Sequence, residues 1–134
     1  MTLIIKKVLF DVIAEHSLEE YPLEACGIIL GDRKGPVKSV RRVFKARNIL
    51  NSPSRYEIDP RDQLTAFTLA DRESIAVIGF YHSHPYWEAT PSSIDAAMAF
   101  YRDVSYVIYS IPTRSLASFI WNGNKFIPEE VKIV

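Results

Sequence analysis

The sequence has little cysteine, no net charge and no long apolar run. Cys26 is the only cysteine among 134 residues, which excludes an internal disulfide framework and a cysteine-rich zinc site and favours a reducing compartment. Lysine plus arginine and aspartate plus glutamate number 16 each, so the whole chain has no net charge to attract nucleic acid or an anionic membrane. Near the N-terminus, Asp11 and Glu15 interrupt the apolar residues, so neither a signal peptide nor a membrane-spanning helix is expected. These features predict a cytoplasmic protein without nucleic-acid or membrane partners.

The composition is typical of a folded globular domain. Hydrophobic residues make up 48% of the chain and charged residues 24%, and a chain of this length can bury a core without disulfides or structural metals. The sequence shows no internal repeat, linker or low-complexity segment. Residues 1–134 are therefore expected to form a single domain.

Apolar periodicity and turn residues predict the order of helices and strands. Pro22 should end the first helix, residues 32–36 should form a turn, and Asn122-Gly123 should form a hairpin. Helices and strands alternate early and strands dominate late, which favours an α/β (α+β) fold with a mixed sheet flanked by helices. Strands are expected at residues 3–6, 24–31, 37–48, 75–84, 104–111, 115–121 and 125–134, and helices at residues 8–20, 59–74 and 90–103.

Two histidines near the end of the expected strand 75–84 are the first candidate site residues. Because strand side chains alternate between faces, His82 and His84 point to the same face, where one metal ion can bind both. The alternative is that one histidine is only a polar residue at the exposed end of the strand. The H-x-H pattern by itself does not decide between these interpretations.

Asp95 is the candidate for a third ligand because it lies near the start of the following helix. The alternative is a capping box, since Ser92 and Asp95 fit the S-x-x-D pattern. With Thr90 as N-cap and Pro91 as the first helical residue, the helix would begin earlier and leave both side chains free. Two histidines and one carboxylate would leave a tetrahedral zinc ion one open position, which is typical of a catalytic site.

A hydrolytic zinc site also needs a general base. Glu24, at the head of the expected strand 24–31, is the candidate. The alternative is an ordinary exposed acid in a loop, which spacing alone favours.

The polar residues at these positions resemble the motif of the JAMM (MPN+) metalloprotease family, E…H-[ST]-H-P-x6-S-x2-D. The chain has Glu24 in "LEACG", then "HSHP" at 82–85, six further residues, and "SSID" at 92–95. The segments "YPLEACGIILG", "RYEIDP", "IGFYHSHP" and "EEVKIV" are similar to small prokaryotic members, including the cysteine-releasing peptidases of sulfur-carrier systems. The resemblance covers nearly the whole chain.

The resemblance implies a role for each motif residue. It implies that His82, His84 and Asp95 hold Zn²⁺, that Glu24 is the general base, and that Ser92 donates a hydrogen bond to the developing oxyanion. It also implies a curved mixed sheet between helices, similar to that of the cytidine deaminases. Deaminase activity itself is excluded because no C-x-x-C follows the histidines.

Two functions are considered on this basis. The first is a zinc-dependent peptidase or isopeptidase that cleaves after the C-terminal Gly-Gly of a ubiquitin-like or sulfur-carrier protein, releasing a cysteine or lysine amine. The alternative is a noncatalytic scaffold of the same fold, although such members typically lose motif residues and this chain has all of them. The oligomeric state is left open.

For most other polar and aromatic residues, a structural role is expected rather than a catalytic one. Seven basic residues and one acidic residue in 31–47 are interpreted as an exposed hairpin whose charges discourage edge pairing, and the lack of interleaved aromatics disfavours single-stranded nucleic acid. Tyr86 and Trp87 either line a groove beside the zinc or only pin their own loop. The remaining expectations are a small buried Cys26, a solvated His16, and packing or capping roles for Ser83 and Ser93.

Overall fold

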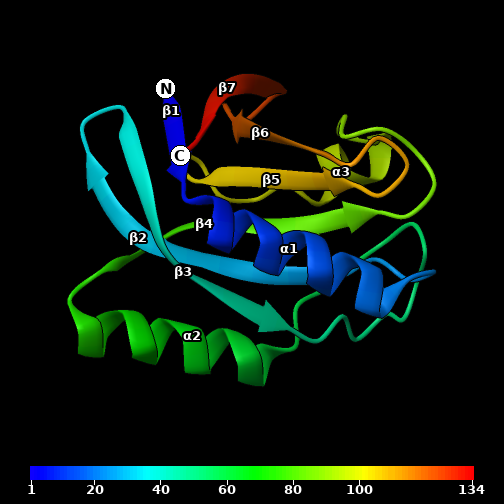
Figure 1. Ribbon diagram of the computed structural model, residues 1–134, viewed down its shortest axis with the longest axis horizontal. Helices are drawn as coiled ribbons and strands as arrows, with labels where there is room; N and C mark the ends of the chain where they lie inside the picture. Colours follow the sequence, from blue (N-terminus) through cyan, green and yellow to red (C-terminus); the bar gives the residue numbers. More distant parts are fainter.

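Seven strands form one sheet that closes on itself, and three helices accompany it (Figure 1). The computed structural model describes residues 1–134. The strands are β1 (Thr2–Ile5), β2 (Cys26–Lys34), β3 (Val37–Ala46), β4 (Ala76–His84), β5 (Ser105–Ser110), β6 (Ser115–Trp121) and β7 (Phe126–Ile133). The helices are α1 (Lys7–Glu20), α2 (Pro60–Glu73) and α3 (Ser93–Met98).

The sheet is mixed, as the sequence predicts. Its strand order is β1-β3-β2-β4-β5-β6-β7, and β1 closes the ring by pairing in parallel with both β3 and β7. β4 and β5 are also parallel, and the other neighbours are antiparallel. The parallel pair β4 and β5 ends on the side of the molecule where α3 lies (Figure 1).

Two apolar clusters hold α1 and α2 against opposite faces of the sheet. On one face, Leu9, Phe10 and Ile13 of α1 pack against a cluster that includes Ile29 and Tyr81. On the other face, the alanines of α2 pack against a second cluster; its buried members are Ile28, Leu30, Ala66, Ala70 and Phe80. β4 is thus covered on both faces, which explains its nearly continuous apolar sequence.

β2 and β4 approach each other closely in the middle of the sheet. Gly27 pairs with Tyr81, and a Cβ at position 27 would collide with the Tyr81 ring and with the carbonyl of Phe44. The next pair in the register is Cys26 with His82, so the same pairing sets the place of the first site histidine. The absence of a side chain at Gly27 therefore lets β4 carry a large ring on one face and His82 on the other.

A buried ion pair lies within the ring of strands, at the end of β5 opposite to His84. Lys38 Nζ is 2.8 Å from Glu129 Oε2, and both side chains are fully buried. Lys38 also donates to Ser105, and the hydroxyls of Ser105 and Ser118 donate to Glu129. Ser105 is at the start of β5, whereas His84 pairs with the last residue of that strand. The network links β3, β5, β6 and β7 through hydrogen bonds that compensate for burying two charges.

The third helix is shorter than predicted and begins later. Its N-cap is Ser92, so the expectation of Thr90 as N-cap and Pro91 as first helical residue is wrong. The helix ends at Met98 rather than near residue 103, because the chain turns extended at Ala99. Beyond it, two consecutive backbone amides donate to the Tyr106 hydroxyl instead of continuing the helical ladder.

The two predicted turns differ in accuracy. The turn expected at 32–36 is confined to Gly35 and Pro36, since β2 continues to Lys34, and Gly35 takes a positive φ of 59°. The hairpin at Asn122-Gly123 is confirmed. Gly123 has a φ of 95°, and the side-chain oxygen of Asn122 accepts hydrogen bonds from the backbone amides of Asn124 and Lys125.

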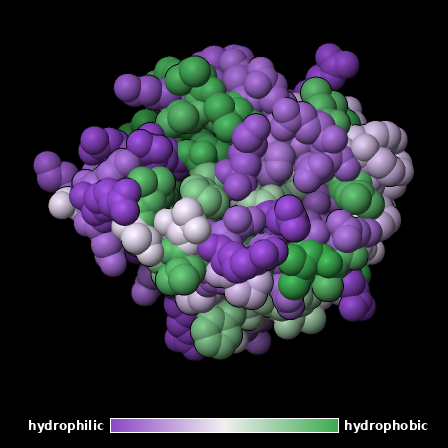
Figure 2. All heavy atoms as spheres, turned by 90° about the horizontal axis from the view of Figure 1, so that it is seen from below, coloured by the Kyte–Doolittle hydropathy of each residue, from purple (hydrophilic) through white to green (hydrophobic).

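Apolar side chains on the face that carries α2 are divided into separate patches among hydrophilic residues (Figure 2). Leu64 and Phe67 of α2 are among the exposed apolar residues of the molecule. None of the three helices combines the length and the apolar character that crossing a membrane would require.

Candidate active site

The two histidines lie together at the buried end of β4. His82 is 2% exposed and His84 is 0% exposed, so the interpretation of either as a polar residue at an exposed strand end is wrong. Their Nε2 atoms are 3.3 Å apart, on the same face of the strand, as the spacing predicts. Two imidazole nitrogens thus converge on one point inside the protein.

A backbone carbonyl fixes the protonation of His84. Its Nδ1 is 2.8 Å from the carbonyl oxygen of Glu88. Because a carbonyl can only accept, Nδ1 carries the proton and donates it, and in the neutral ring Nε2 then has a free lone pair. This is the tautomer and the kind of supporting contact that metal-binding histidines have.

Asp95 faces both histidines from the first turn of α3. Its carboxylate oxygens lie 3.2 Å from His82 Nε2 and 3.1 Å from His84 Nε2. Burial favours the neutral acid, but the close contacts of the carboxylate with His82 and His84 and the hydrogen bond from the Ser92 amide outweigh it and hold the pKa of Asp95 well below its ordinary value. The side chain is therefore a carboxylate at neutral pH.

The three side chains fit a zinc ion. In a tetrahedral zinc site with bonds of about 2.0 to 2.1 Å, neighbouring ligand atoms are about 3.3 to 3.4 Å apart. The Nε2 atoms of His82 and His84 are 3.3 Å apart, and each faces a different oxygen of the Asp95 carboxylate, Oδ1 at 3.2 Å from His82 and Oδ2 at 3.1 Å from His84, so all three side chains are close enough to contact one ion. Two imidazoles and one carboxylate are also ligands that zinc accepts.

Glu24 completes the cluster and is not an exposed loop acid. It is 1% exposed, and its carboxylate lies within 4.8 Å of ligand atoms of both histidines. Its Oε1 is the one buried side-chain oxygen or nitrogen without a hydrogen-bond partner. Burial, and then the charge of Asp95, raise the pKa of Glu24 to about 9. A buried acid with an unpaired oxygen beside two histidines is a candidate for metal binding or proton transfer.

Ser83 holds the segment that carries Glu24 against β4. Its hydroxyl accepts a hydrogen bond from the Ala25 amide at 2.8 Å, and its own amide donates to the Ala25 carbonyl at 3.0 Å. Ser83 is fully buried. From the sequence, Ser83 is expected to have only a local packing or capping role. Its two hydrogen bonds with Ala25 instead join β4, the strand of the two histidines, to the residue after Glu24.

Ser92 is both a helix cap and a neighbour of the site. Its Oγ accepts a hydrogen bond from the Asp95 amide at 3.0 Å, while the Asp95 carboxylate accepts one from the Ser92 amide at 2.9 Å. The prediction that these side chains are not used for capping is therefore wrong. The Ser92 hydroxyl hydrogen is not used in the cap and can be donated to another group.

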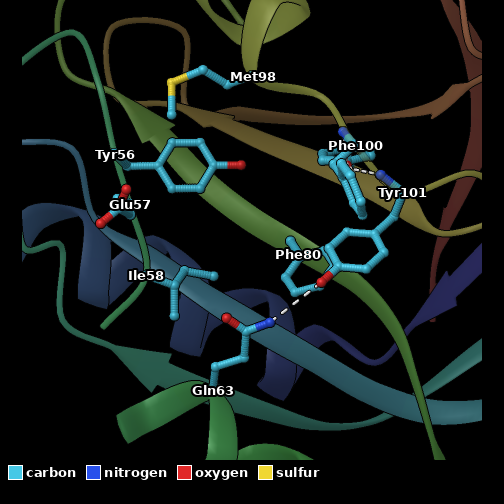
Figure 3. A pocket seen from close by; sticks show the side chains of 9 residues that line it. Tyr56, Glu57, Ile58, Gln63, Phe80, Met98, Phe100 and Tyr101 are labelled. Atoms are coloured by element: carbon cyan, nitrogen blue, oxygen red, sulfur yellow. Dashed lines mark hydrogen bonds between the residues drawn. The ribbon is translucent and has the colours of Figure 1, made fainter. Parts of the chain in front are cut away.

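Tyr56 covers the site, although its position in the sequence did not indicate this. Its ring stacks on His82 with centroids 4.5 Å apart and planes 20° apart. The same ring lines a pocket of about 270 Å³, where it lies below Met98 and opposite Phe100 and Tyr101 (Figure 3). The segment "RYEIDP" marked the region, but only the fold brings this aromatic side chain onto the histidine.

Tyr86 and Trp87 lie on the other side of the histidines. The Trp87 ring is 6.0 Å from the His84 ring, and its carbonyl accepts a hydrogen bond from Ser110, which pins the loop. Tyr86 packs on Tyr21 and lines a second pocket of about 460 Å³. Both predicted alternatives hold in part, since the pair lies beside the site and also stabilises its own loop.

The expectation for Cys26 is confirmed and that for His16 is wrong. Cys26 is fully buried, and burial raises the pKa of its thiol to about 12, so it is an unreactive packing residue. His16 is buried rather than solvated: its Nδ1 is 2.7 Å from the Tyr81 hydroxyl, and burial lowers its pKa.

Most basic residues of 31–47 have partners of their own. Lys38 is in the buried ion pair, and Val37–Ser39 pair with β1, so the start of β3 is not an edge that charges need to protect. The ion pairs of the others are Arg41 with Asp32, Arg42 with Glu73, and Lys45 with Glu19. The explanation by edge protection is therefore wrong for the first part of β3.

A mixed sheet with two histidines and two carboxylates gathered at the buried end of one strand defines a metallopeptidase of the JAMM type. Residues 6–121 match the family described as prokaryotic homologs of the JAB domain, and the chain belongs to this family. The resemblance seen in the sequence is thereby confirmed.

Several relatives are similar to most of the chain. A desampylase from Haloferax volcanii is 29% identical over 121 residues, covering 87% of this chain and 85% of the relative. A CysO-cysteine peptidase from Mycobacterium tuberculosis is 32% identical over 109 residues, covering 81% and 73%. A probable TtuB-protein conjugate cleaving protease from Thermus thermophilus is 34% identical over 110 residues, covering 81% and 70%.

Solved structures agree with the fold. The solution structure of a protein from Desulfitobacterium hafniense matches with a TM-score of 0.91 and 32% identity, covering 98% of this chain and 92% of that protein. One from Salinibacter ruber matches with a TM-score of 0.75 and 25% identity, covering 97% and 90%.

Proposed function

We propose that this protein is a zinc-dependent peptidase or isopeptidase that hydrolyses the amide bond after the C-terminal Gly-Gly of a ubiquitin-like or sulfur-carrier protein. The observation that carries the proposal is the buried cluster of two histidines and two carboxylates, in a chain of the JAB family. Residues 1–134 would act as one domain, since their seven strands close a single sheet.

The names of the relatives support the substrate class. One relative is a CysO-cysteine peptidase and another a probable TtuB-protein conjugate cleaving protease, so each is named for cleaving something joined to a named protein. The chain covers most of the length of both. We extend this class of substrate to the present protein.

His82, His84 and Asp95 would hold the zinc ion, as their spacing and protonation allow. When bound, zinc supplies a Lewis acid that polarises the scissile carbonyl and makes water more acidic. The Glu88 carbonyl keeps the His84 ring in the binding tautomer, and the Ser92 amide orients the Asp95 carboxylate.

Glu24 would move the proton. Its unpaired Oε1 accepts a proton from the attacking water and returns it to the departing amine. Only the ionised carboxylate can do this, and a cation held by the neighbouring ligands favours that form over the neutral acid. Burial keeps bulk water from competing for the same oxygen.

Ser92 would donate its hydroxyl hydrogen to the oxygen that becomes negative as the amide is attacked. The hydroxyl is held in place by the Asp95 amide, which occupies one of its acceptor sites and leaves its hydrogen free. A donor that is already oriented loses little on the way to the transition state.

Two aromatic rings favour glycine next to the scissile bond. Tyr56 lies on His82 and Trp87 lies beside His84, so both sides of the histidine pair carry bulky rings. An extended tail with side chains would meet these rings, whereas Gly-Gly has none. Contacts with the folded body of the modifier would then supply binding energy for placing the tail.

The proposal is tested with three substrates and the zinc-loaded protein. These are a sulfur carrier ending in Gly-Gly joined to cysteine or lysine, the same conjugate with Ala-Ala in that position, and a generic unfolded protein. Cleavage of the first alone, lost with a chelator and restored by zinc, is the expected result. Equal cleavage of all three would make the protein a general peptidase, and no cleavage would contradict the proposal.

A further inference from the structure

We infer that Asn48 is a positioning residue that sets the place of the Glu24 backbone and of the Tyr56 ring over His82 through a single side-chain amide. The role of Asn48 in hydrolysis rests on the proposed function, but its role in holding the site together can be measured without activity. Asn48 follows β3 and is 6% exposed. It does not belong to the motif that identifies the catalytic residues.

The Asn48 side chain makes four hydrogen bonds. Its Nδ2 donates to the carbonyl of Glu24 at 3.1 Å and to the carbonyl of Arg55 at 3.0 Å. Its Oδ1 accepts from the amides of Leu50 and Glu57, both at 3.1 Å. These four bonds use both donors and both acceptor sites of the amide.

The partners fix the orientation of the amide and exclude similar side chains. Two carbonyls lie on the nitrogen side and two N–H groups on the oxygen side, so a flipped amide would face like groups at all four contacts. An aspartate would direct a carboxylate oxygen at two carbonyls. A serine side chain is too short to reach all four groups. Among side chains of this length, only asparagine can therefore donate to the two carbonyls and accept from the two amides.

Through these bonds Asn48 acts on both sides of the site. The partners Arg55 and Glu57 are the residues before and after Tyr56, whose ring stacks on His82. The partner Glu24 carries the candidate base. One amide therefore ties the loop that covers the histidine to the residue that provides the carboxylate.

Glu24 depends on its backbone for its position because its Oε1 has no hydrogen-bond partner. Its amide donates to the carbonyl of Ser52 at 2.9 Å, in the same loop, and its carbonyl accepts from Asn48. Ser83 holds the next residue against β4. If Asn48 is lost, the Glu24 carbonyl loses its bond to the loop and only the Ser52 bond to the Glu24 amide remains. A displacement of about 1 Å at the base is enough to slow chemistry by about a hundredfold.

The first test observes the site by NMR in the chelated protein. The chain has three histidines, so ¹³C-labelled imidazoles give three resolvable ring signals. Tyr56→Leu removes the ring from His82 and gives the reference shift. Asn48→Ala should move the His82 signal toward that reference and leave the buried His16 signal in place. The matched control is Asn122→Ala, which removes an asparagine that also accepts two turn amides but lies in the β6–β7 turn.

The second test separates positioning from stability by kinetics. Zinc-loaded Asn48→Ala should keep its metal and show a kcat lower by ten- to a hundredfold with KM within about twofold, while Asn122→Ala keeps the wild-type kcat. Should Asn48→Ala not fold, amide hydrogen exchange in the wild type decides, since Leu50 and Glu57 should be protected as strongly as β3. An unchanged His82 signal in a folded Asn48→Ala variant, or fast exchange at both amides, would overturn the inference. If the wild type cleaves nothing, the proposed function fails while the NMR and exchange results still decide this one.

Discussion

Ser92 and Asp95 exchange two hydrogen bonds at the start of α3, and the same Asp95 carboxylate contacts both site histidines. Helix capping and contact with the two site histidines, which the sequence presents as alternatives, are combined in one side chain. The cap orients the carboxylate, and the carboxylate fixes the helix start beside β4. Loss of the Asp95 side chain should therefore affect both the start of α3 and the candidate metal site, and a suitable substitution can separate these two effects.

Asp95→Asn should lose most of the bound zinc and keep the helix. An amide oxygen can still accept from the Ser92 amide, but it is neutral and a poor zinc ligand. Metal analysis after dialysis should show a small fraction of the zinc found in the wild type, which is expected at about one ion per chain. The control is Asp62→Asn, another first-turn acid that accepts one backbone amide. Full zinc occupancy in Asp95→Asn would leave Asp95 with the capping role alone.

Glu24 should make the metal-free protein less stable as pH rises. Its pKa is raised from 4.5 to about 9 in the folded state, so the folded protein holds this proton more tightly than the unfolded chain. The resulting stability is complete below the unfolded value and is lost progressively as pH rises toward the folded value. Glu24→Gln carries no such proton. In chelator, its free energy of unfolding relative to wild type should increase from about pH 5 to about pH 9, measured by denaturant titration. A difference that is constant with pH would show that Glu24 is not buried as described.

Ser92→Ala should slow hydrolysis by about a hundred- to a thousandfold because a preoriented donor to the oxyanion is lost. The substitution also removes an N-cap, which costs about 1 kcal/mol. Ser92→Thr keeps a hydroxyl for both purposes and should retain most of the rate. Zinc content should be the same in both variants. A Ser92→Ala enzyme with the wild-type single-turnover rate would leave the hydroxyl with the capping role only.

The sequence predicted which residues lie together at the site better than it predicted their surroundings. The spacing of His82, His84 and Asp95 could be interpreted because a strand end and a helix start bring such residues together wherever the loop between them is short. Glu24 depended on the motif, since its burial results from a distant loop. Tyr56 and Asn48 could not be placed, because both act through contacts between segments that have no fixed spacing in sequence.

Local patterns failed where tertiary contacts compete with them. Thr90-Pro91 is a good helix start, but the reciprocal bonds of Ser92 and Asp95 place the start two residues later. His16 lies among glutamates in a helix, yet its ring reaches the Tyr81 hydroxyl in the core. The closed ring of strands likewise depends on pairing between β1 and β7, at opposite ends of the chain.

Lys38→Met should destabilise the fold without changing the site. It leaves Glu129 buried without its cation, which costs about 3 to 5 kcal/mol. The double variant Lys38→Met/Glu129→Leu removes both charges and should recover much of that loss. Because the ion pair lies at the other end of β5 from His84, zinc content and kcat of the folded protein should not change. A double variant less stable than the single one would show that the charges themselves hold the ring closed.

The most direct test of the account compares wild type and Glu24→Gln, loaded to equal zinc content, in single-turnover cleavage of a Gly-Gly conjugate. Glu24 is assigned to proton transfer and not to metal binding, so the variant should bind zinc and substrate as the wild type does. Its cleavage rate should be lower by at least about a hundredfold, because glutamine cannot accept the proton of water. Equal rates at equal zinc content would contradict the assignment of Glu24 as the base, and zinc loss in Glu24→Gln would make Glu24 a ligand.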